Sequence, residues 1–496
     1  MNLVDLWVPS VVLLPIVVGL ACVFLPWRRA LEVLHLVGVT MTCVLLLWLV
    51  SHVVQAGAMT TDHLFFHVDA LSAVLLLILA LVGWTAGLHS IGYIRREWSE
   101  KALNMRQIRA YYALYHGFFA TMIFVVVVNN LGLLWVGMEA TTVVSAFLVA
   151  IYHKAEAIEA TWKYLLLCSA GIALALLGVI LLYASSIVRL GVRSQGLDWT
   201  VLSNPNLHLQ PQLVLLSFAF ILVGFGTKVG LAPMHFWLPD AHSQAPSPIS
   251  ALLSGALLNC AMFALIRFAV VAEDTLSGHW VQHLLIGFGL LSVFVALPFL
   301  LVQRDFKRML AFSTVEHMGI IAVAMGIGGP LGYSAALFQM FNHSMGKSML
   351  FLGAGNVVQQ YRTKQMGRMV GVLRRMPFTG VVLIIGLLTV TGVPPFSVFT
   401  SEFTIFVAGF QNRDILPTIV LMALIALVFA AMLYHLLRMV FGEHERVKSP
   451  EVPLSRWSTW PLLLPMVLVV TMGVYAPQSF SELIQHASDI LARIPS

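Results

Sequence analysis

Stretches of about twenty apolar residues recur along the whole sequence and are separated by short polar connections. A helix needs about 20 such residues to cross a bilayer, and the sequence contains about 14 candidate segments. With 59% hydrophobic and only 10% charged residues, the composition excludes an ordinary soluble globule. The first segment, Val4 to Leu25, carries Asp5 where a signal peptide would be basic, so we expect it to be a span. The sequence therefore predicts an all-α polytopic membrane protein with about 14 transmembrane helices.

The basic residues between the apolar segments are distributed unevenly. If the spans alternate in direction, 21 of the 28 Lys and Arg residues lie on one side and four on the other, and three lie within spans. Cytoplasmic loops of membrane proteins carry an excess of Lys and Arg. We therefore expect both termini on the non-cytoplasmic side. The net charge of +6 is then a signal of membrane topology, and no nucleic-acid partner is predicted.

A lysine stands beside a helix break in the segment Gly224 to Gly255. Lys228 follows an apolar run and is flanked by Gly226 and Gly230, with Pro233 just beyond. A charge within the membrane costs several kcal/mol unless it faces a partner or water, and such residues usually mark ion pathways. Broken helices at mid-membrane form ion sites in transporters. A kinked structural helix whose lysine extends to the interface is the alternative interpretation.

Glu139 is a second ionisable residue inside an apolar helix. It lies nine residues into the segment that begins at Leu131. A carboxylate in such surroundings is either protonated or paired. An acid and a lysine on separate helices of one bundle form a natural pair, so we expect Glu139 to contact Lys228.

The second half of the chain has its own cluster of ionisable residues. His343 and Lys347 are four residues apart and therefore share one face of a helix, where they can exchange a proton directly or through a water molecule. Glu316 and His317 lie in the preceding apolar segment, about a turn and a half beyond the basic residues Arg304 to Arg308. This spacing favours burial of the pair, although an interfacial position is the alternative.

A short motif occurs twice in the chain. Thr227 to Pro233 and Thr389 to Pro395 share the pattern TxxGxxP, and the second copy is followed by Glu402. About five spans separate the copies, an odd number, so the two copies enter the membrane from opposite sides. This pattern predicts two inverted five-helix repeats, each with a broken helix. The expected domains are 1–107 (three-helix scaffold), 108–272 (first repeat, helices 4–8), 273–442 (second repeat, helices 9–13) and 443–496 (helix 14 and tail).

Several weaker candidates have an equally good structural explanation. His235, Asp240 and His242 follow the first break and could supply protons to Lys228, or could lie among lipid headgroups. His435 is more often an interfacial residue than a functional one. Asp69 stands before an apolar segment, where a carboxylate can cap the helix N-terminus, and we prefer that role to a catalytic one.

No cofactor or metal site is predicted in this chain. The cysteines Cys22, Cys43, Cys168 and Cys260 lie far apart within apolar segments, without CxxC spacing. Neither a GxGxxG pattern nor a P-loop follows a strand-like run, and the 17 histidines show no transition-metal spacing. The chain is therefore expected to contain no catalytic redox site, and any electron chemistry belongs to partners.

The motifs together resemble the antiporter-like subunits of respiratory complex I and of Mrp-type cation/proton antiporters. The resemblance extends over roughly 68–441, and three segments are most similar to hydrogenase-4 component F, a subunit of group 4 hydrogenase and formate hydrogenlyase complexes: LGLLWVGMEATT, WKYLLLCSAGIALALLG and HFWLPDAHSQAPSPISALLSG. The resemblance implies a pair formed by Glu139 and Lys228. It also implies functional roles for Lys347, His343 and Glu402. Many relatives carry a lysine or histidine in the eighth helix, where this chain has Ser254 and Asn259, so the link there is expected to rely on water.

The expected function is proton translocation along a polar axis through Glu139, Lys228, His343, Lys347 and Glu402. The resemblance implies a place in the cytoplasmic (inner) membrane of a bacterium or archaeon, beside other membrane subunits and, through them, a hydrophilic redox arm. Lysine suits proton transfer because its pKa falls on desolvation and recovers when an anion approaches. An Mrp-like sodium/proton antiporter subunit is one alternative, and a membrane anchor without net pumping is another.

Overall fold

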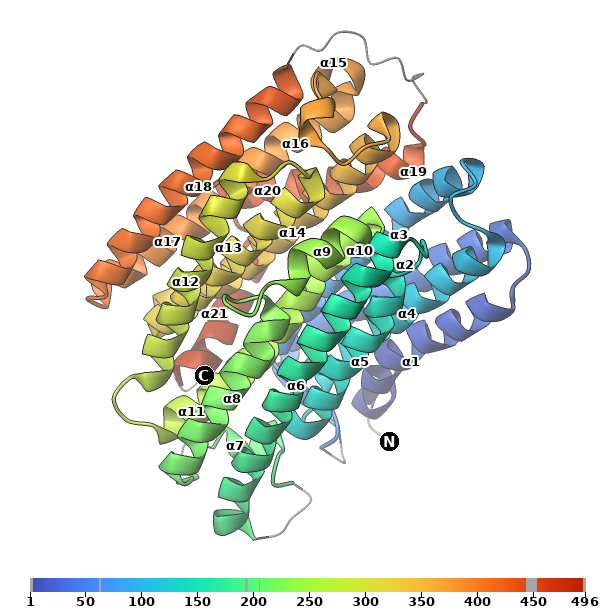
Figure 1. Cartoon of the computed structure of the whole chain (residues 1–496). Coiled ribbons are helices and arrows are strands. Elements are labelled where there is room, and N and C mark those ends of the chain that lie inside the picture. Colours follow the sequence, from blue (N-terminus) through green and yellow to red (C-terminus); the bar gives the residue numbers. More distant parts are fainter. Residues whose placement is uncertain (1–2, 62–63, 192–194, 205, 443–452, 494–496) are drawn as a thin grey trace.

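The computed structural model describes residues 3–61, 64–191, 195–204, 206–442 and 453–493. In these residues the chain forms a bundle of helices, most of which run along one common direction (Figure 1). Twelve of the described helices are long and apolar enough to cross a membrane. The prediction of a helical polytopic membrane protein is thereby confirmed, although a short β-hairpin stands beside the helices, and the first predicted span is a helix.

The N-terminal part consists of three long helices and a small antiparallel hairpin. The strands pair Met59 with Val68 and Thr60 with His67. The elements are α1 (Leu3–Phe24), α2 (Arg28–Ala56), β1 (Met59–Thr60), β2 (His67–Val68) and α3 (Ala70–Ser99). Helix α2 packs along α3, and α1 packs along α4 (Met105–Val127).

The middle of the chain contains the first broken helix. Its elements after α4 are α5 (Leu131–Val149), α6 (Ala155–Leu190), α7 (Trp199–Leu202), α8 (Pro211–Val229), α9 (Trp237–Gln244), α10 (Ser247–Leu252), the π-helix η1 (Leu253–Leu257) and α11 (Leu258–Thr275). Helices α10, η1 and α11 form one continuous span that is buried along its most apolar window. Helix α8 packs along α6, and α9 packs against both α6 and α13 (Phe306–Ile327).

The last part of the chain contains the second broken helix. Its elements are α12 (Trp280–Val302), α13, α14 (Gly329–Tyr361), η2 (Met366–Arg368), α15 (Val372–Arg375), α16 (Pro377–Val390), α17 (Ser397–Gln411), α18 (Ile415–Phe441), α19 (Arg456–Thr459), η3 (Trp460–Leu462), α20 (Leu463–Val474) and α21 (Gln478–Ala492). Helix α14 occupies the interior and contacts α3, α10, α13, α16, α17, α20 and α21.

The twelve apolar spans are two fewer than the sequence suggested. Helix α14 carries many polar residues and does not reach the hydropathy of the others, while α16 and α17 are short because the chain breaks between them. The predicted domain boundary at 442/443 and the basic residues Arg193, Arg446 and Lys448, which entered the charge count, lie outside the described residues.

Both copies of the TxxGxxP motif break a helix, as predicted. Helix α8 ends before Gly230, which has φ +83°, and α16 ends shortly before Gly392, which has φ +64°. Left-handed φ values favour glycine because they cause a steric penalty for other residues. A Cβ atom on Gly392 would also lie 2.1 Å from the carboxylate of Glu402. The glycine of the second copy, Gly392, therefore allows the backbone to approach Glu402 closely.

Asp69 joins two distant parts of the chain. Its side chain accepts a hydrogen bond from the backbone N–H of Ser72 (2.9 Å), which confirms the predicted helix cap. The same carboxylate accepts two further hydrogen bonds from Arg267 of α11, at 2.6 and 2.8 Å. Burial alone would raise the pKa of Asp69, but the neighbouring Arg267 guanidinium and His67 ring hold it well below its usual range. Sequence analysis did not predict this ion pair.

Asp69→Asn is expected to destabilise the protein by about 3–5 kcal/mol, since it leaves the buried Arg267 guanidinium without its counter-charge. The measurement is thermal or denaturant unfolding of the purified protein, with Glu482→Gln on the exposed side of α21 as the control. An unfolding free energy equal to that of the control would contradict a structural role for the pair. Because the folded-state pKa of Asp69 is depressed, its contribution is present above about pH 4 and is lost as the pH falls toward that pKa.

The first three helices also bury polar side chains. His35 Nδ1 lies 3.0 Å from His116 Nε2 of α4, and His35 Nε2 lies 3.0 Å from the carbonyl oxygen of Gly87. His89 Nε2 lies 3.1 Å from the side-chain oxygen of Asn356 in α14. Interhelical hydrogen bonds of this kind hold helices together in an apolar solvent. They are compatible with the scaffold role expected for this region.

Candidate functional site

Lys228 is fully buried near the C-terminal end of α8. Its ammonium donates hydrogen bonds to Thr142 Oγ1 of α5 (2.6 Å) and to the Tyr164 hydroxyl of α6 (2.9 Å). It also lies 5.0 Å from the centroid of the Tyr164 ring, within the range of a cation–π interaction. Lys228 therefore does not extend to an interface. Two neighbouring helices, α5 and α6, satisfy it inside the bundle, where its protonation depends on a few specific neighbours.

Glu139 does not form the expected direct contact with Lys228. Its Oε1 accepts a hydrogen bond from Ser169 Oγ of α6 (2.8 Å), and its Oε2 is buried without a hydrogen-bond partner in the described structure. The ion pairs among the described residues do not include Glu139 with Lys228, so the predicted contact is wrong. The physical reason is that the hydroxyl groups of Thr142 and Tyr164 already satisfy the ammonium. Thr142 lies one helical turn from Glu139 on α5, so the acid and the lysine are near neighbours.

Glu139 is only half-buried on α5. Val136 and Val143, one turn before and after it, are 48% and 44% exposed. Glu139 thus stands at the edge of the bundle within an apolar helix, with its Oε2 enclosed although the residue is partly exposed. A carboxylate in this position is costly to leave against lipid tails.

Sequence analysis missed the hydroxyl groups that hold Lys228. Thr142 could have been found, because it lies three residues after Glu139 and shares its helix face. Tyr164 had no local signal, since its hydroxyl reaches Lys228 only through the packing of α6 against α8. The tyrosine hydroxyl is itself 2.7 Å from Ser145 Oγ, so a continuous hydrogen-bonded group runs from α5 to α8.

Tyr164→Phe is expected to lower proton flux by about tenfold, because loss of one acceptor leaves a buried charge less well satisfied, at a cost of about 1–3 kcal/mol. The aromatic ring and its cation–π contact remain. The measurement is proton uptake by vesicles that contain the complex, and Tyr183→Phe on the same helix is the matched control. Equal flux in the two variants would contradict a role for the Tyr164 hydroxyl.

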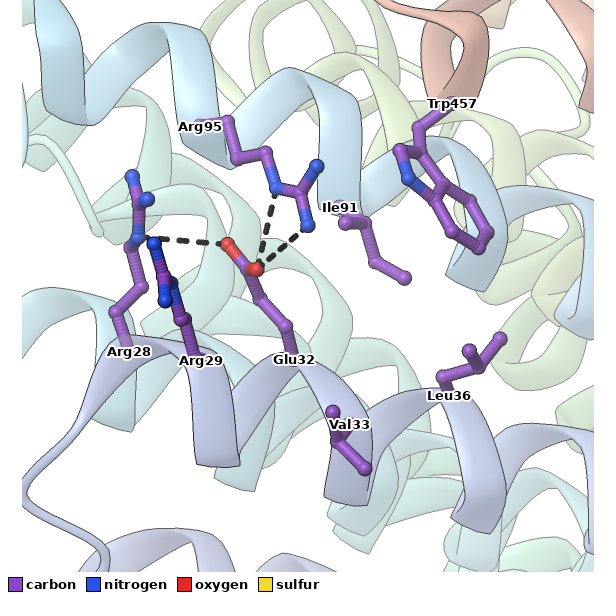
Figure 2. A pocket seen from close by; sticks show the side chains of 8 residues that line it. All are labelled: Arg28, Arg29, Glu32, Val33, Leu36, Ile91, Arg95 and Trp457. Atoms are coloured by element: carbon purple, nitrogen blue, oxygen red, sulfur yellow. Dashed lines mark hydrogen bonds and ion pairs between the residues drawn. The ribbon is translucent and has the colours of Figure 1, made fainter.

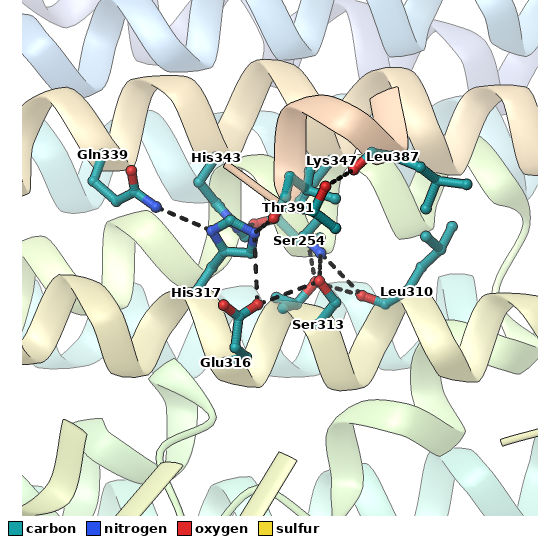
Figure 3. Close-up of polar contacts among 12 residues, drawn as sticks. Ser254, Leu310, Ser313, Glu316, His317, Gln339, His343, Lys347, Leu387 and Thr391 are labelled. Atoms are coloured by element: carbon teal, nitrogen blue, oxygen red, sulfur yellow. Dashed lines mark hydrogen bonds and ion pairs between the residues drawn. The ribbon is translucent and has the colours of Figure 1, made fainter. Parts of the chain in front are cut away.

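Lys347 of α14 is the centre of a second buried group. Its ammonium donates to Ser313 Oγ of α13 (2.7 Å) and lies 3.4 Å from the carbonyl oxygen of Leu310 (Figure 3). Ser313 Oγ lies 3.4 Å from Glu316 Oε2. Ser313 therefore bridges the lysine and the acid. The burial predicted for Glu316 and His317 is confirmed, since both are at most 1% exposed.

Glu316, His317 and Glu402 converge from α13 and α17. One ligand atom from each lies within 4.8 Å of the others, and all three residues are buried. His317 Nε2 lies 3.6 Å from Glu316 Oε2, and its Nδ1 lies 3.1 Å from Gln339 Nε2 of α14 (Figure 3). The His343 ring lies 5.1 Å from the His317 ring. The structure thus brings together four sequence-predicted residues that lie on three helices: His343, Glu316, His317 and Glu402.

The same three side chains are also a possible cation site, which sequence analysis did not predict. Two carboxylates and one imidazole can supply three ligands to a metal ion. Ser313 links Lys347 to Glu316, so the ammonium already occupies the neighbourhood of one carboxylate. This arrangement is suited to moving a proton between a base and two acids.

Ser254 of the π-helix η1 connects the eighth span to this cluster. Its hydroxyl lies 2.8 Å from Thr314 Oγ1, and its carbonyl oxygen lies 3.3 Å from His343 Nε2. Asn259 donates to Ser344 Oγ (2.7 Å). Ser254 and Asn259 of the eighth span therefore contact α13 and α14 directly.

His242 lies beside the Lys347 group. It is fully buried in α9 and stacks on Phe351, one turn beyond Lys347 on α14, with 5.0 Å between ring centroids. Both of its ring nitrogens lack a hydrogen-bond partner in the described structure. His235 likewise has two unpartnered ring nitrogens. Buried polar atoms of this kind are usually satisfied by water, so His242 is a candidate for proton transfer near Lys347.

The remaining candidates have structural partners. Asp240 forms ion pairs with Lys163 (3.2 Å) and with Arg308, which favours an anchoring role in the first turn of α9. Lys364 donates to the carbonyl oxygen of Ser243 (2.6 Å), and burial lowers the pKa of Lys364. His435 Nε2 lies 3.0 Å from the carbonyl oxygen of Leu300, so it joins α18 to α12. This contact involves no residue of the buried cluster around Lys347.

Residues 128–433 match the protein family described as "NADH:quinone oxidoreductase/Mrp antiporter, TM". Over 427 residues the chain is 38% identical to the hydrogenase-4 component F homolog of Methylacidiphilum infernorum (isolate V4), with 86% of this chain and 89% of that protein covered.

Solved structures show the same fold. A chain of the archaeal membrane-bound sulfane sulfur reductase matches with a TM-score of 0.85 at 24% identity, covering 98% of this chain and 97% of that chain. A chain of respiratory complex I from Thermus thermophilus matches with a TM-score of 0.81 at 22% identity, covering 98% and 99%. Both likenesses extend over nearly the whole molecule.

Proposed function

Because this chain belongs to the family of membrane subunits shared by NADH:quinone oxidoreductases and Mrp antiporters, we propose that it moves protons along its buried ionisable residues when a partner undergoes redox chemistry. The chain is an antiporter-like subunit of the complex I and group 4 hydrogenase type. The observation that carries the proposal is the enclosed group around Lys347, in which one lysine, two acids and two histidines meet inside an apolar bundle. A simple membrane anchor needs no such group.

The proposed path has two lysine stations joined by a histidine. Lys228, held by Thr142 and Tyr164, is the first station, and Glu139 acts on it through its charge from one helical turn away. His242 and water carry the proton toward Lys347. From there Ser313, Glu316, His317 and Glu402 lead to the exit, with His343 beside them. Each lysine holds its proton when an anion is near and releases it when the anion moves or is neutralised.

The proposed topology has 14 spans and two inverted repeats. We propose that α14 and the broken pair α16–α17 are the two spans that complete the set. Equivalent packing supports the repeat, because α8 packs along α6 while α16 and α17 pack along α14. The left-handed glycines at both breaks support it as well. The domains then follow the boundaries 1–107, 108–272, 273–442 and 443–496, with both termini outside the cytoplasm of a bacterium or archaeon.

The proposed partners are other membrane subunits and, through them, a hydrophilic redox arm. The half-buried Glu139 supports a neighbouring subunit on α5, since such a subunit would keep the exposed part of this residue, whose Oε2 is already enclosed, away from lipid. The proposed proton path runs through side chains and water and requires no cofactor.

The decisive experiment is ion flux in proteoliposomes that contain the purified complex. Proton uptake per turnover of the partner enzyme is measured with and without sodium. Proton uptake that persists without sodium supports the proposal. Strict dependence on sodium would instead favour the Mrp-like alternative, with the cation held near Glu316 and Glu402, and absence of uptake during turnover would favour an anchor.

Glu139→Gln is expected to reduce proton flux by about tenfold or more, whereas Glu139→Asp should retain most of it. The amide keeps an acceptor for Ser169 but removes the charge that stabilises the buried ammonium. Ser169→Ala is a matched variant that removes the hydrogen bond and keeps the charge, so it should resemble Glu139→Asp. Equal flux for the Gln and Asp variants would contradict the electrostatic role of Glu139.

A further inference from the structure

A cavity lined by arginines opens at one end of α2 and α3. It has a volume of about 480 Å³, and the residues around it include Arg28, Arg29, Glu32, Leu36, Arg95 and Trp457 (Figure 2). The polar side chains lie on one side of the cavity, and Leu36 and Trp457 lie on the other. None of these residues belongs to the proposed proton path.

The cavity carries an excess of positive charge. Arg95 donates two hydrogen bonds to Glu32 Oε2, at 3.1 and 2.8 Å, and Arg28 Nε lies 3.5 Å from Glu32 Oε1. Arg29 forms no ion pair with the residues that the structure describes. One carboxylate thus faces three guanidinium groups, and two positive charges remain unmatched.

An apolar cavity of about 410 Å³ adjoins this one. Trp457 lines both cavities, and the second is walled by Trp84 and Leu88 of α3 together with Trp460, Pro461 and Leu464 of the η3–α20 segment. Arg456 also lines it. Trp460 is 68% exposed, as is typical of aromatic residues that mark a membrane interface.

The two cavities follow a single face of α3. Arg95, Ile91, Leu88 and Trp84 are three or four residues apart and therefore lie above one another on the helix. The distance from Arg95 to Trp84 along the helix axis is about 16 Å at 1.5 Å per residue. This is about half the 30 Å thickness of the hydrocarbon core of a bilayer. With α3 spanning a bilayer, the charged cavity would lie at headgroup depth, and the apolar cavity would extend along one leaflet.

We propose that this cleft binds one anionic phospholipid. The phosphate lies against Arg28, Arg29 and Arg95, and an acyl chain fills the apolar cavity between α3 and α20. Basic pockets between transmembrane helices bind anionic headgroups through the same electrostatic attraction. A zwitterionic headgroup would place its ammonium among the arginines, so an anionic headgroup is favoured. The lipid would also bridge the N-terminal helices to the segment that contains Trp457, which lies far away in the sequence.

The test measures lipid binding to the delipidated complex by native mass spectrometry. Phosphatidylglycerol and phosphatidylcholine with identical acyl chains are titrated against wild type, Arg28→Gln/Arg29→Gln and the matched control Arg106→Gln/Arg109→Gln. The control removes the same charge at the same end of the bundle. The apparent Kd for phosphatidylglycerol should rise on the order of 25-fold in the first double variant, since each basic residue near the headgroup contributes about fivefold. The Kd of the control variant should change little. Leu88→Trp, which fills the apolar cavity, should raise the Kd for both lipids.

Four results would overturn the proposal. Equal Kd values for the two lipids would remove the charge preference, and equal Kd values for the two double variants would place the lipid elsewhere. Displacement of the lipid by inorganic phosphate alone would indicate a simple anion site. A photoreactive group introduced at Leu36 that captures a protein subunit, and no lipid, in the intact complex would show that a partner fills the cleft.

Discussion

Lys228→Met is expected to abolish coupled proton movement while the protein still inserts and folds. Methionine has a similar length but cannot carry a proton. Thr142 and Tyr164 keep other partners in its absence, because Thr142 Oγ1 lies 3.3 Å from the carbonyl oxygen of Met138 and the Tyr164 hydroxyl lies 2.7 Å from Ser145 Oγ. The substitution therefore leaves no buried hydroxyl unsatisfied and removes the cost of a buried charge.

The measurement for Lys228→Met is proton flux per turnover of the partner enzyme in proteoliposomes. Lys154→Met is the control, since Lys154 is exposed at the N-terminal end of α6 and belongs to no buried group. Assembly of both variants is checked by co-purification of the partner subunits. Flux at the wild-type level in an assembled Lys228→Met complex would exclude Lys228 from the path.

Glu402→Gln and Lys347→Met are expected to block proton transfer to the same extent, although the two residues lie on different helices. In the proposed path they are consecutive stations, joined through Ser313, Glu316 and His317. Loss of either station interrupts the whole path. Glutamine in place of Glu402 keeps the shape of the side chain, which matters because Gly392 approaches it closely, so the effect should be chemical and not structural.

Residual flux distinguishes one path from two in this second test. If separate channels served the two halves of the chain, each variant would disable one route and leave roughly half of the flux. A half-sized residual in either variant would thus reject the single path. Glu482→Gln, on the exposed side of α21, provides the control for loss of a carboxylate.

The ionisable residues and the helix breaks could be predicted from the sequence because each is visible locally. A charge inside an apolar segment is unusual, and a repeated Gly and Pro pattern interrupts two such segments. Lys228, Lys347 and Glu402 were found this way, and the structure buries all three. Glu316 and His317, for which an interfacial position was the alternative, are central members of the second cluster.

The partners of these residues could not be predicted, because they depend on how helices rotate against one another. Glu139 was expected to contact Lys228, yet hydroxyl groups from α5 and α6 satisfy the lysine. Asp69 was predicted only as a helix cap, although its carboxylate also binds Arg267, which is 198 residues away in the sequence. Neither contact has a signal within a single segment.

The interior position of α14 has a consequence for how the protein enters the membrane. This helix has 33 residues, carries His343 and Lys347, and is surrounded by other helices. A lysine at the centre of an isolated span costs about 2.5–3.5 kcal/mol during translocon-mediated insertion, so α14 gains little by partitioning into lipid alone. Helix α13 ends at Ile327 and α14 begins at Gly329, which leaves only Gly328 between them. Biogenesis should thus deliver α13 and α14 as one hairpin. A topology assigned from hydropathy alone would omit α14 and place the connection from α14 to α16 on the wrong side of the membrane.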